Sequence, residues 1–191
     1  MLVGVLLAAG AGRRFGGTKL LAPLAGATVG ALAARALGPA VDRRLAVVRP
    51  GDDALARILS AEGFETLPFA GAPEGMGASL AFGVSAAPEA DGWIVALADM
   101  PFVRAGTVQS LARLLRAGAP LVAPVFGGRR GHPVGFGRTF LAELTALHGE
   151  EGGRSILEAH TGQLVGMNCD DPGVLRDVDS SEDLPAEGRE Q

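Results

Sequence analysis

Residues 2–19 read LVGVLLAAGAGRRFGGTK, an apolar run that leads directly into a glycine-rich loop. The apolar part, 2–7, predicts a buried strand, and the glycines after it predict a loop. Glycines let a backbone approach a ligand closely, and the N–H groups they expose bind anions. The two arginines inside the loop add the positive charge that phosphate requires. The segment therefore predicts a phosphate-binding loop at a strand end, and the alternative is a surface turn with solvated arginines.

Two common phosphate-binding templates do not fit this loop. Gly12 and Gly17 have the spacing of a Walker A motif, but Thr18 precedes Lys19 instead of following it. The dinucleotide fingerprint Gly-x-Gly-x-x-Gly also fails, because Gly16 comes one residue too late. The reversed order at Thr18 disfavours a P-loop kinase.

Lysine occurs once in the chain, at Lys19, against 16 arginines. A single lysine among so many arginines marks a position where a compact ammonium is preferred to a planar guanidinium. The alternative is chance. Its place at the end of the glycine loop favours contact with phosphate.

Apolar runs alternate with amphipathic segments along the whole chain. The apolar runs predict strands over 2–7, 45–48, 64–67, 93–98 and 121–125. The amphipathic segments predict helices over 28–37, from 52 onward, over 78–86, around 108–115 and around 140–147. This alternation predicts a single α/β domain over 1–184, with three α/β/α layers and a mostly parallel sheet. The polar residues 185–191 are expected to form a disordered tail.

Composition excludes several classes of protein. The 191 residues are 48% hydrophobic and 20% charged, which excludes wholesale disorder. The longest apolar runs are far shorter than a membrane span, and no signal peptide precedes the first strand, so we expect a cytoplasmic protein. The single cysteine excludes an intrachain disulfide, and the net charge of −4 argues against nucleic-acid binding.

Carboxylates follow a buried strand and recur near the end of the chain. Asp99 ends the run 93–98, where open α/β sheets bind their ligands, and a carboxylate there can hold Mg²⁺ across substrate phosphates. The alternative is a cap on the next helix. Asp177 and Asp179 are candidates for a second metal ligand, although Ser180 beside acidic residues also predicts a helix start.

A second loop, 127–133, combines glycines, arginines and a histidine. It contains Arg130, Gly131, His132 and Pro133, and it follows the predicted strand 121–125. A basic loop at this edge of the sheet can bind a second anionic substrate. A plain hairpin with exposed arginines is the equal alternative.

Four motifs in this order resemble the molybdenum-cofactor nucleotidyltransferases, a family with a Rossmann-like, glycosyltransferase-A-type fold. They are LLAAGAGRRFGGTK at 6–19, LADMP at 97–101, RGHPV at 130–134 and DVDSSEDL at 177–184. Ala9, where guanylyltransferases of the family have glycine, and the RGHPV motif resemble the cytidylyltransferase branch. The resemblance implies Mg²⁺-dependent transfer of CMP from CTP to the terminal phosphate of molybdopterin cofactor, with release of pyrophosphate. A molybdoenzyme or its maturation chaperone is then an expected partner.

The residues and the resemblance together predict the members of the site. Nucleotide binding is expected at Leu7, Ala8, Ala9, Gly10, Gly12, Arg13, Arg14, Gly17, Lys19, Gly75, Gly77 and Asp99. Of these residues, we expect Lys19, Arg14 and Asp99 to be catalytic. We expect the metal to be held by Asp99 together with Asp177 or Asp179. We expect the acceptor to be bound by Arg130, Gly131, His132 and Pro133. An anionic phosphate nucleophile needs no general base, which agrees with the absence of a recognisable Ser-His-Asp arrangement.

Two other classes of function stay open at this stage. The same fold can act with another nucleotide or acceptor, as a guanylyltransferase or as a sugar-phosphate or phospholactate nucleotidyltransferase. A non-catalytic nucleotide-binding partner is the other class, and Lys19 and Asp99 argue against it.

Overall fold

Eight strands form one sheet in the computed structural model, which describes residues 1–10 and 19–184. They are β1 (Leu2–Leu7), β4 (Arg43–Val48), β5 (Glu65–Pro68), β6 (Gly92–Leu97), β7 (Leu121–Phe126), β8 (Arg129–Arg130), β9 (Val134–Gly137) and β10 (Leu164–Asn168). The order across the sheet is β10-β7-β9-β6-β1-β4-β5, and β8 pairs with β7. All neighbours are parallel except at β9 and β8, which run antiparallel to their partners. The predicted, mostly parallel sheet is confirmed.

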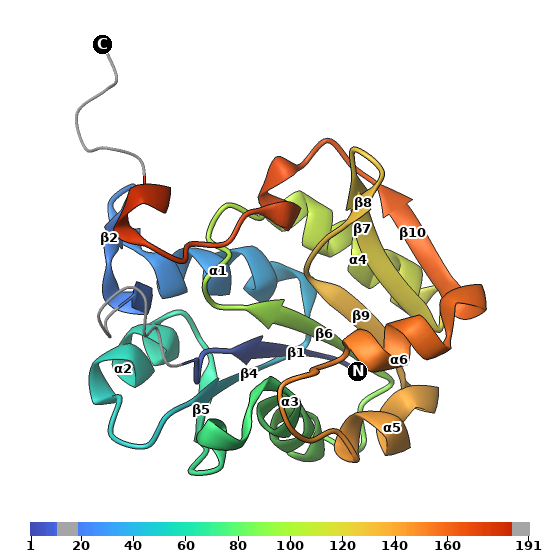
Figure 1. The fold of residues 1–191 in the computed structure, drawn as a ribbon, viewed down its shortest axis with the longest axis horizontal. Helices are drawn as coiled ribbons and strands as arrows, with labels where there is room; N and C mark the ends of the chain where they lie inside the picture. The colour runs from blue at the N-terminus through green and yellow to red at the C-terminus, as the bar shows by residue number, and fades with distance from the viewer. Residues whose placement is uncertain (11–18, 185–191) are drawn as a thin grey trace.

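Helices cover both faces of this sheet (Figure 1). They are α1 (Val29–Leu37), α2 (Asp53–Ala61), α3 (Met76–Ser85), α4 (Ala105–Arg116), α5 (Leu141–Thr145) and α6 (Arg154–Ala159). One core cluster packs α1, α2 and α4 against the sheet, and another packs α3, α5 and α6 against the opposite face. The three-layer α/β/α prediction is therefore confirmed. A short hairpin, β2 (Pro23–Leu24) and β3 (Ala27–Thr28), precedes α1, and the hydroxyl of Thr28 caps that helix by accepting from the N–H of Ala31 at 3.3 Å.

The chain after residue 130 departs from the predicted alternation. Strand β9 was not predicted because its four residues include two glycines, and β10 was not predicted because its side chains are mostly exposed. Helix α6 has only six residues, too few for a clear apolar stripe. The helix predicted around 140–147 was too long: α5 has five residues and follows a 3₁₀ turn at Arg138–Phe140.

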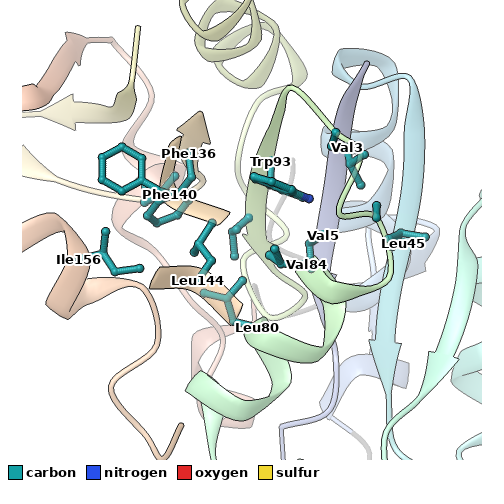
Figure 2. Close-up of a cluster of buried hydrophobic side chains, with 14 of the residues drawn as sticks. Val3, Val5, Leu45, Leu80, Val84, Trp93, Phe136, Phe140, Leu144 and Ile156 are labelled. Atoms are coloured by element: carbon teal, nitrogen blue, oxygen red, sulfur yellow. The ribbon is translucent and has the colours of Figure 1, made fainter. Parts of the chain in front are cut away.

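The core on the α3 side is built around Trp93 of β6, which is fully buried. Figure 2 shows Trp93 between Val3 and Phe136, its register partners on β1 and β9. Leu80 of α3 and Leu144 of α5 close the cluster from outside the sheet. Because Trp93 is the only tryptophan and the chain has no tyrosine, intrinsic fluorescence reports on this one core.

The C-terminal segment returns across the sheet and reaches the end of β6. The N–H of Val178 donates to the carbonyl oxygen of Asp99 at 2.8 Å. Upstream, the buried carboxylate of Asp171 accepts from the Thr107 hydroxyl at 2.7 Å, the Arg104 N–H at 2.9 Å and the Gly173 N–H at 3.0 Å. Asp171 therefore ties this segment to the start of α4.

We expect Asp171→Asn to lower the free energy of unfolding by about 1–3 kcal/mol, because the amide group turns a donor toward groups that themselves donate. For a chain of this size, that corresponds to a decrease in melting temperature of roughly 2–12 °C. Thermal unfolding followed by Trp93 fluorescence measures it. The exposed neighbour gives a matched control, Asp170→Asn, which should melt like the wild type. Equal melting temperatures for the two variants would contradict the anchoring role of Asp171.

Within the part of the chain that the structure describes, no helix is both long and apolar enough to cross a membrane.

Candidate active site

A cleft of about 940 Å³ opens at the carboxyl ends of β1, β4 and β6. Its floor includes Leu7, Ala9 and Gly10, which end β1 and begin the glycine loop. Lys19 and Asp99 line one side of it. Neighbouring parallel strands end at the same edge of a sheet, so the predicted crevice forms where these two motifs meet.

Lys19 lies between two carboxylates that come from distant parts of the chain. Its Nζ is 2.8 Å from Oδ2 of Asp99 and 3.4 Å from Oδ1 of Asp179. The Lys19 side chain is 12% exposed, whereas those of Asp99 and Asp179 are 27% and 50% exposed. Burial by itself lowers the pKa of Lys19, but the hydrogen bond and charge of Asp99, together with Asp179, outweigh it and raise that pKa above 10.5. Lys19 is therefore an ammonium over the whole neutral pH range.

Three carboxylates at this edge form a cluster that suits a divalent cation. One oxygen from each of Asp99, Asp177 and Asp179 lies within 4.8 Å of the others. Oxygen ligands lie about 2.1 Å from Mg²⁺, so two ligands of one ion are about 3–4 Å apart and small side-chain rotations would suffice. Carboxylate oxygens are also the donors that hard divalent cations prefer.

The backbone near Asp179 is held by the next turn, Ser181–Asp183. Oδ2 of Asp183 accepts from the N–H groups of Ser180 at 2.7 Å and Asp179 at 2.9 Å. These donors lower the pKa of Asp183. The predicted helix start is confirmed, because Ser180 caps this turn, whereas metal binding by Asp177 or Asp179 stays a prediction.

Only some of the residues predicted to bind the nucleotide line the cleft in the described part of the chain. Leu7, Ala9, Gly10 and Gly75 line the cleft, whereas the N–H of Ala8 donates to the carbonyl of Val47 at 2.9 Å inside the sheet. Gly12, Arg13, Arg14 and Gly17 lie outside the described residues, so their roles stay predictions, as does the proposed tail at 185–191.

Gly77 has a packing role that the sequence did not indicate. Its N–H donates to the carbonyl of Gly149 at 2.7 Å, and a Cβ on Gly77 would lie 2.6 Å from the His148 carbonyl oxygen. Gly75 is as crowded, since a Cβ there would lie 2.4 Å from Gly149. The start of α3 is thus docked on the 148–150 loop, and nucleotide contact by Gly77 remains a prediction.

A smaller cavity of about 200 Å³ adjoins the cleft and shares Leu7, Met76 and Leu97 with it. Its remaining lining is mainly apolar, with Arg130, His132 and Arg154 as polar groups. The loop before it is a hairpin, as the plainer interpretation predicted, because Val125 pairs with Arg130 and Phe126 with Arg129.

His132 is mostly enclosed, and its Nδ1 has no hydrogen-bond partner among the described residues. Burial lowers its pKa and Arg130 adds to the effect, whereas Asp99 and Asp177 oppose it. His132 is therefore neutral at pH 7. Gly131 lines the same cavity, while Pro133 lies behind it, toward α4. Acceptor binding by these four motif residues stays a prediction.

Comparison with known proteins decides the family. The sequence profile of the MobA-like NTP transferase domain matches residues 4–164. This chain belongs to the MobA-like NTP transferase family. Family membership makes it a nucleotidyltransferase and confirms the resemblance at the level of the MobA-like NTP transferases.

Relatives of this MobA-like chain match it over nearly its whole length. It is 32% identical to the purine catabolism protein PucB of Bacillus subtilis, over 95% of this chain and 93% of PucB. The crystal structure of Rv0371c from Mycobacterium tuberculosis superposes with a TM-score of 0.84 at 26% identity, over 95% and 94% of the two chains. A second structure of that protein is a complex with manganese. A nucleotidyl transferase from Methanothermobacter thermautotroptrophicus has a TM-score of 0.81 at 25% identity, over 96% and 94%.

The site of this MobA-like transferase also includes residues that sequence reasoning missed. Arg49, Phe69, Met76 and Glu150 line the cleft. A signal was present for Arg49, because it directly follows the strand 45–48 just as Asp99 follows 93–98. Phe69, Met76 and Glu150 lie in loops or at a helix start, where no local pattern indicates that they face a cleft.

Proposed function

We propose that this chain transfers CMP from CTP to the terminal phosphate of molybdopterin cofactor and releases pyrophosphate, with Mg²⁺ as the metal. The observation that carries the proposal is the contact of Lys19 with Asp99 and Asp179 in the larger cleft, which shares Leu7, Met76 and Leu97 with the smaller cavity. Two adjoining cavities of this kind would let a triphosphate and a second phosphate meet near a cation and a carboxylate cluster. The recipient of the dinucleotide product would be a molybdoenzyme or its maturation chaperone.

The transfer forms one P–O bond and breaks another. An anionic oxygen of the acceptor phosphate attacks the α-phosphorus of CTP, and the bond from that phosphorus to the β-phosphate oxygen breaks, which releases pyrophosphate. The nucleophile carries no proton, so no general base is needed, and the neutral His132 is compatible with this. Lys19 would neutralise the charge that develops on the phosphates, and preorganised charge of this kind lowers the barrier.

Asp99, with Asp177 or Asp179, would hold Mg²⁺, which supplies positive charge to the α-phosphate and the leaving pyrophosphate. Their clustered oxygens support this role. The manganese complex of the mycobacterial relative supports a divalent cation in the family.

In this proposal the nucleotide binds in the larger cleft. The adjoining cavity then receives the acceptor, which is flat, partly apolar and carries a phosphate. Arg130 and Arg154 at that cavity are suited to an anion. Ala9 and the RGHPV motif at 130–134 support CTP over GTP through the resemblance to cytidylyltransferases.

Pyrophosphate release with each of the four nucleoside triphosphates, with and without molybdenum cofactor, tests the proposal. We expect kcat/KM for CTP to exceed that for GTP by about 10²-fold, a difference of about 2.7 kcal/mol that one or two good hydrogen bonds can supply. Equal values for the two nucleotides would contradict the cytidylyltransferase assignment. Release that requires a sugar phosphate or phospholactate would replace the acceptor, and no release with any acceptor would favour a nucleotide-binding protein without catalysis.

A further inference from the structure

Arg49 brings into the cleft a cation whose terminal nitrogens have no hydrogen-bond partner among the residues that the structure describes. It lines the cleft directly after β4, and its Nε donates to the carbonyl oxygen of Ala9 at 2.8 Å. Within residues 1–10 and 19–184, no hydrogen bond or ion pair involves its Nη1 or Nη2. The Nε contact fixes one side of the guanidinium, so the outer edge, with two parallel N–H donors, remains available to a ligand.

Lys19 and Arg49, the two cations that line the cleft within the described part of the chain, lie on opposite sides of β1. Lys19 contacts Asp99 at the end of β6, whereas Arg49 follows β4 on the other side. Strands are about 4.8 Å apart, so the ends of β6 and β4 are separated by about 10 Å, which is comparable to the span from the α-phosphate to the base of a nucleotide. The carboxylate cluster and Lys19 mark the phosphate end of the cleft, and Arg49 therefore lies toward the other end.

The Arg49 side of the cleft suits a nucleobase. Its lining there includes Pro50, Phe69, Ala70 and Pro73, which carry no charge. Phe69 is supported from behind by Phe82 of α3, with ring centroids 4.5 Å apart and planes inclined by 18°. A heteroaromatic ring gains from contact with such an apolar wall, whereas a triphosphate does not.

We propose that Arg49 reads the base by donating two hydrogen bonds, from Nη1 and Nη2, to the adjacent acceptors O2 and N3 of cytosine. This role rests on the proposed function, which puts CTP in the cleft. Two neighbouring acceptors match the outer edge of a guanidinium, as they do in bidentate pairs with carboxylates. Uracil has the same shape, but its N3 carries a hydrogen that faces the arginine donors. Arg49 is therefore a specificity-determining residue that selects CTP over UTP.

Binding of three ligands to the full-length protein in the presence of Mg²⁺ tests this role: CTP, UTP and ribose 5′-triphosphate, which has no base. We expect Arg49→Gln to weaken CTP binding by about 10–100-fold, the size of one bidentate base contact. The dissociation constants of UTP and ribose 5′-triphosphate should change by less than about threefold, because neither uses both donors. Arg49→Lys, which keeps the charge and a donor within reach of Ala9 but lacks the two-donor edge, should show the same loss of CTP preference. Arg57→Gln, an exposed site on α2 outside the cleft, is the matched control and should bind all three ligands like the wild type.

The results separate a failure of the proposed role of Arg49 from a failure of the proposed function. Equal weakening of all three ligands would mean that Arg49 contacts phosphate or only supports the loop, which overturns its role but leaves CTP as the substrate. Unchanged CTP binding in Arg49→Gln and Arg49→Lys would also overturn the base-reading role of Arg49. A wild-type protein that binds CTP no better than ribose 5′-triphosphate would overturn both proposals. The Trp93 fluorescence of each variant shows whether it is folded.

Discussion

Asp99→Asn is expected to lower kcat/KM for pyrophosphate release by about 10³-fold or more, which corresponds to about 4 kcal/mol of transition-state stabilisation. The substitution keeps the size of the side chain but removes one negative charge from the carboxylate cluster. It also removes the charge from the 2.8 Å contact with Lys19, so that only a neutral amide oxygen can accept from the ammonium on this side. Both the metal and the main cation of the site would then be misplaced.

The Asp99 variant should nevertheless fold, because this side chain lies at the sheet edge and is 27% exposed. We expect the melting temperature, followed by Trp93 fluorescence, to change by no more than a few degrees. Titration with Mn²⁺ should show a loss of metal affinity in Asp99→Asn, and the exposed Asp53→Asn on α2 serves as the control. Full turnover by the variant, or by the wild type in EDTA, would refute the metal role.

Lys19→Ala is expected to lower kcat/KM by about 10²–10³-fold, as the loss of one preorganised charge does at other active sites. Lys19→Arg should still cost at least about tenfold, or about 1.4 kcal/mol. The reason is geometric. One Nζ atom lies 2.8 Å and 3.4 Å from two carboxylates on different segments, and a wide, planar guanidinium cannot take the same position without displacing one of them. Pyrophosphate-release kinetics measure both variants, with Arg57→Ala as a control for loss of an exposed cation. Kinetically silent Lys19→Arg would show that any positive charge suffices.

The raised pKa of Lys19 adds a pH test to this prediction. Because the pKa in the folded protein lies above its value in the unfolded chain, the contribution of Lys19 to stability is complete below pH 10.5 and decreases as the pH rises through the folded-state pKa. Activity should therefore not decline between pH 7 and 9 through loss of the Lys19 charge. A basic limb in that range that disappears in Lys19→Arg would contradict the raised pKa.

Local patterns were sufficient to predict most of the sheet and its helices up to residue 130. Apolar runs such as 93–98 predict buried strands because a parallel strand covered on both faces has no polar side, and Thr28 predicts the start of α1 because its hydroxyl can accept from a free N–H of the first turn. Strand β9 could not be predicted from such patterns, since VGFG is paired by β6 and β7 on either side and by Pro120, which are all distant in the sequence.

The sequence by itself determined which chemical groups the site can use: a glycine loop with its single lysine, and aspartates after a buried strand and near residue 180. Their types and their positions at strand ends follow from short-range rules. Only the tertiary structure decided which of these groups meet. Lys19 pairs with Asp99 and Asp179, 80 and 160 residues further along the chain, and Arg49 contacts Ala9, 40 residues earlier. Such contacts depend on the order of strands in the sheet and on the return of the C-terminal segment to the end of β6. No local pattern encodes either of these, because both result from the packing of the whole core.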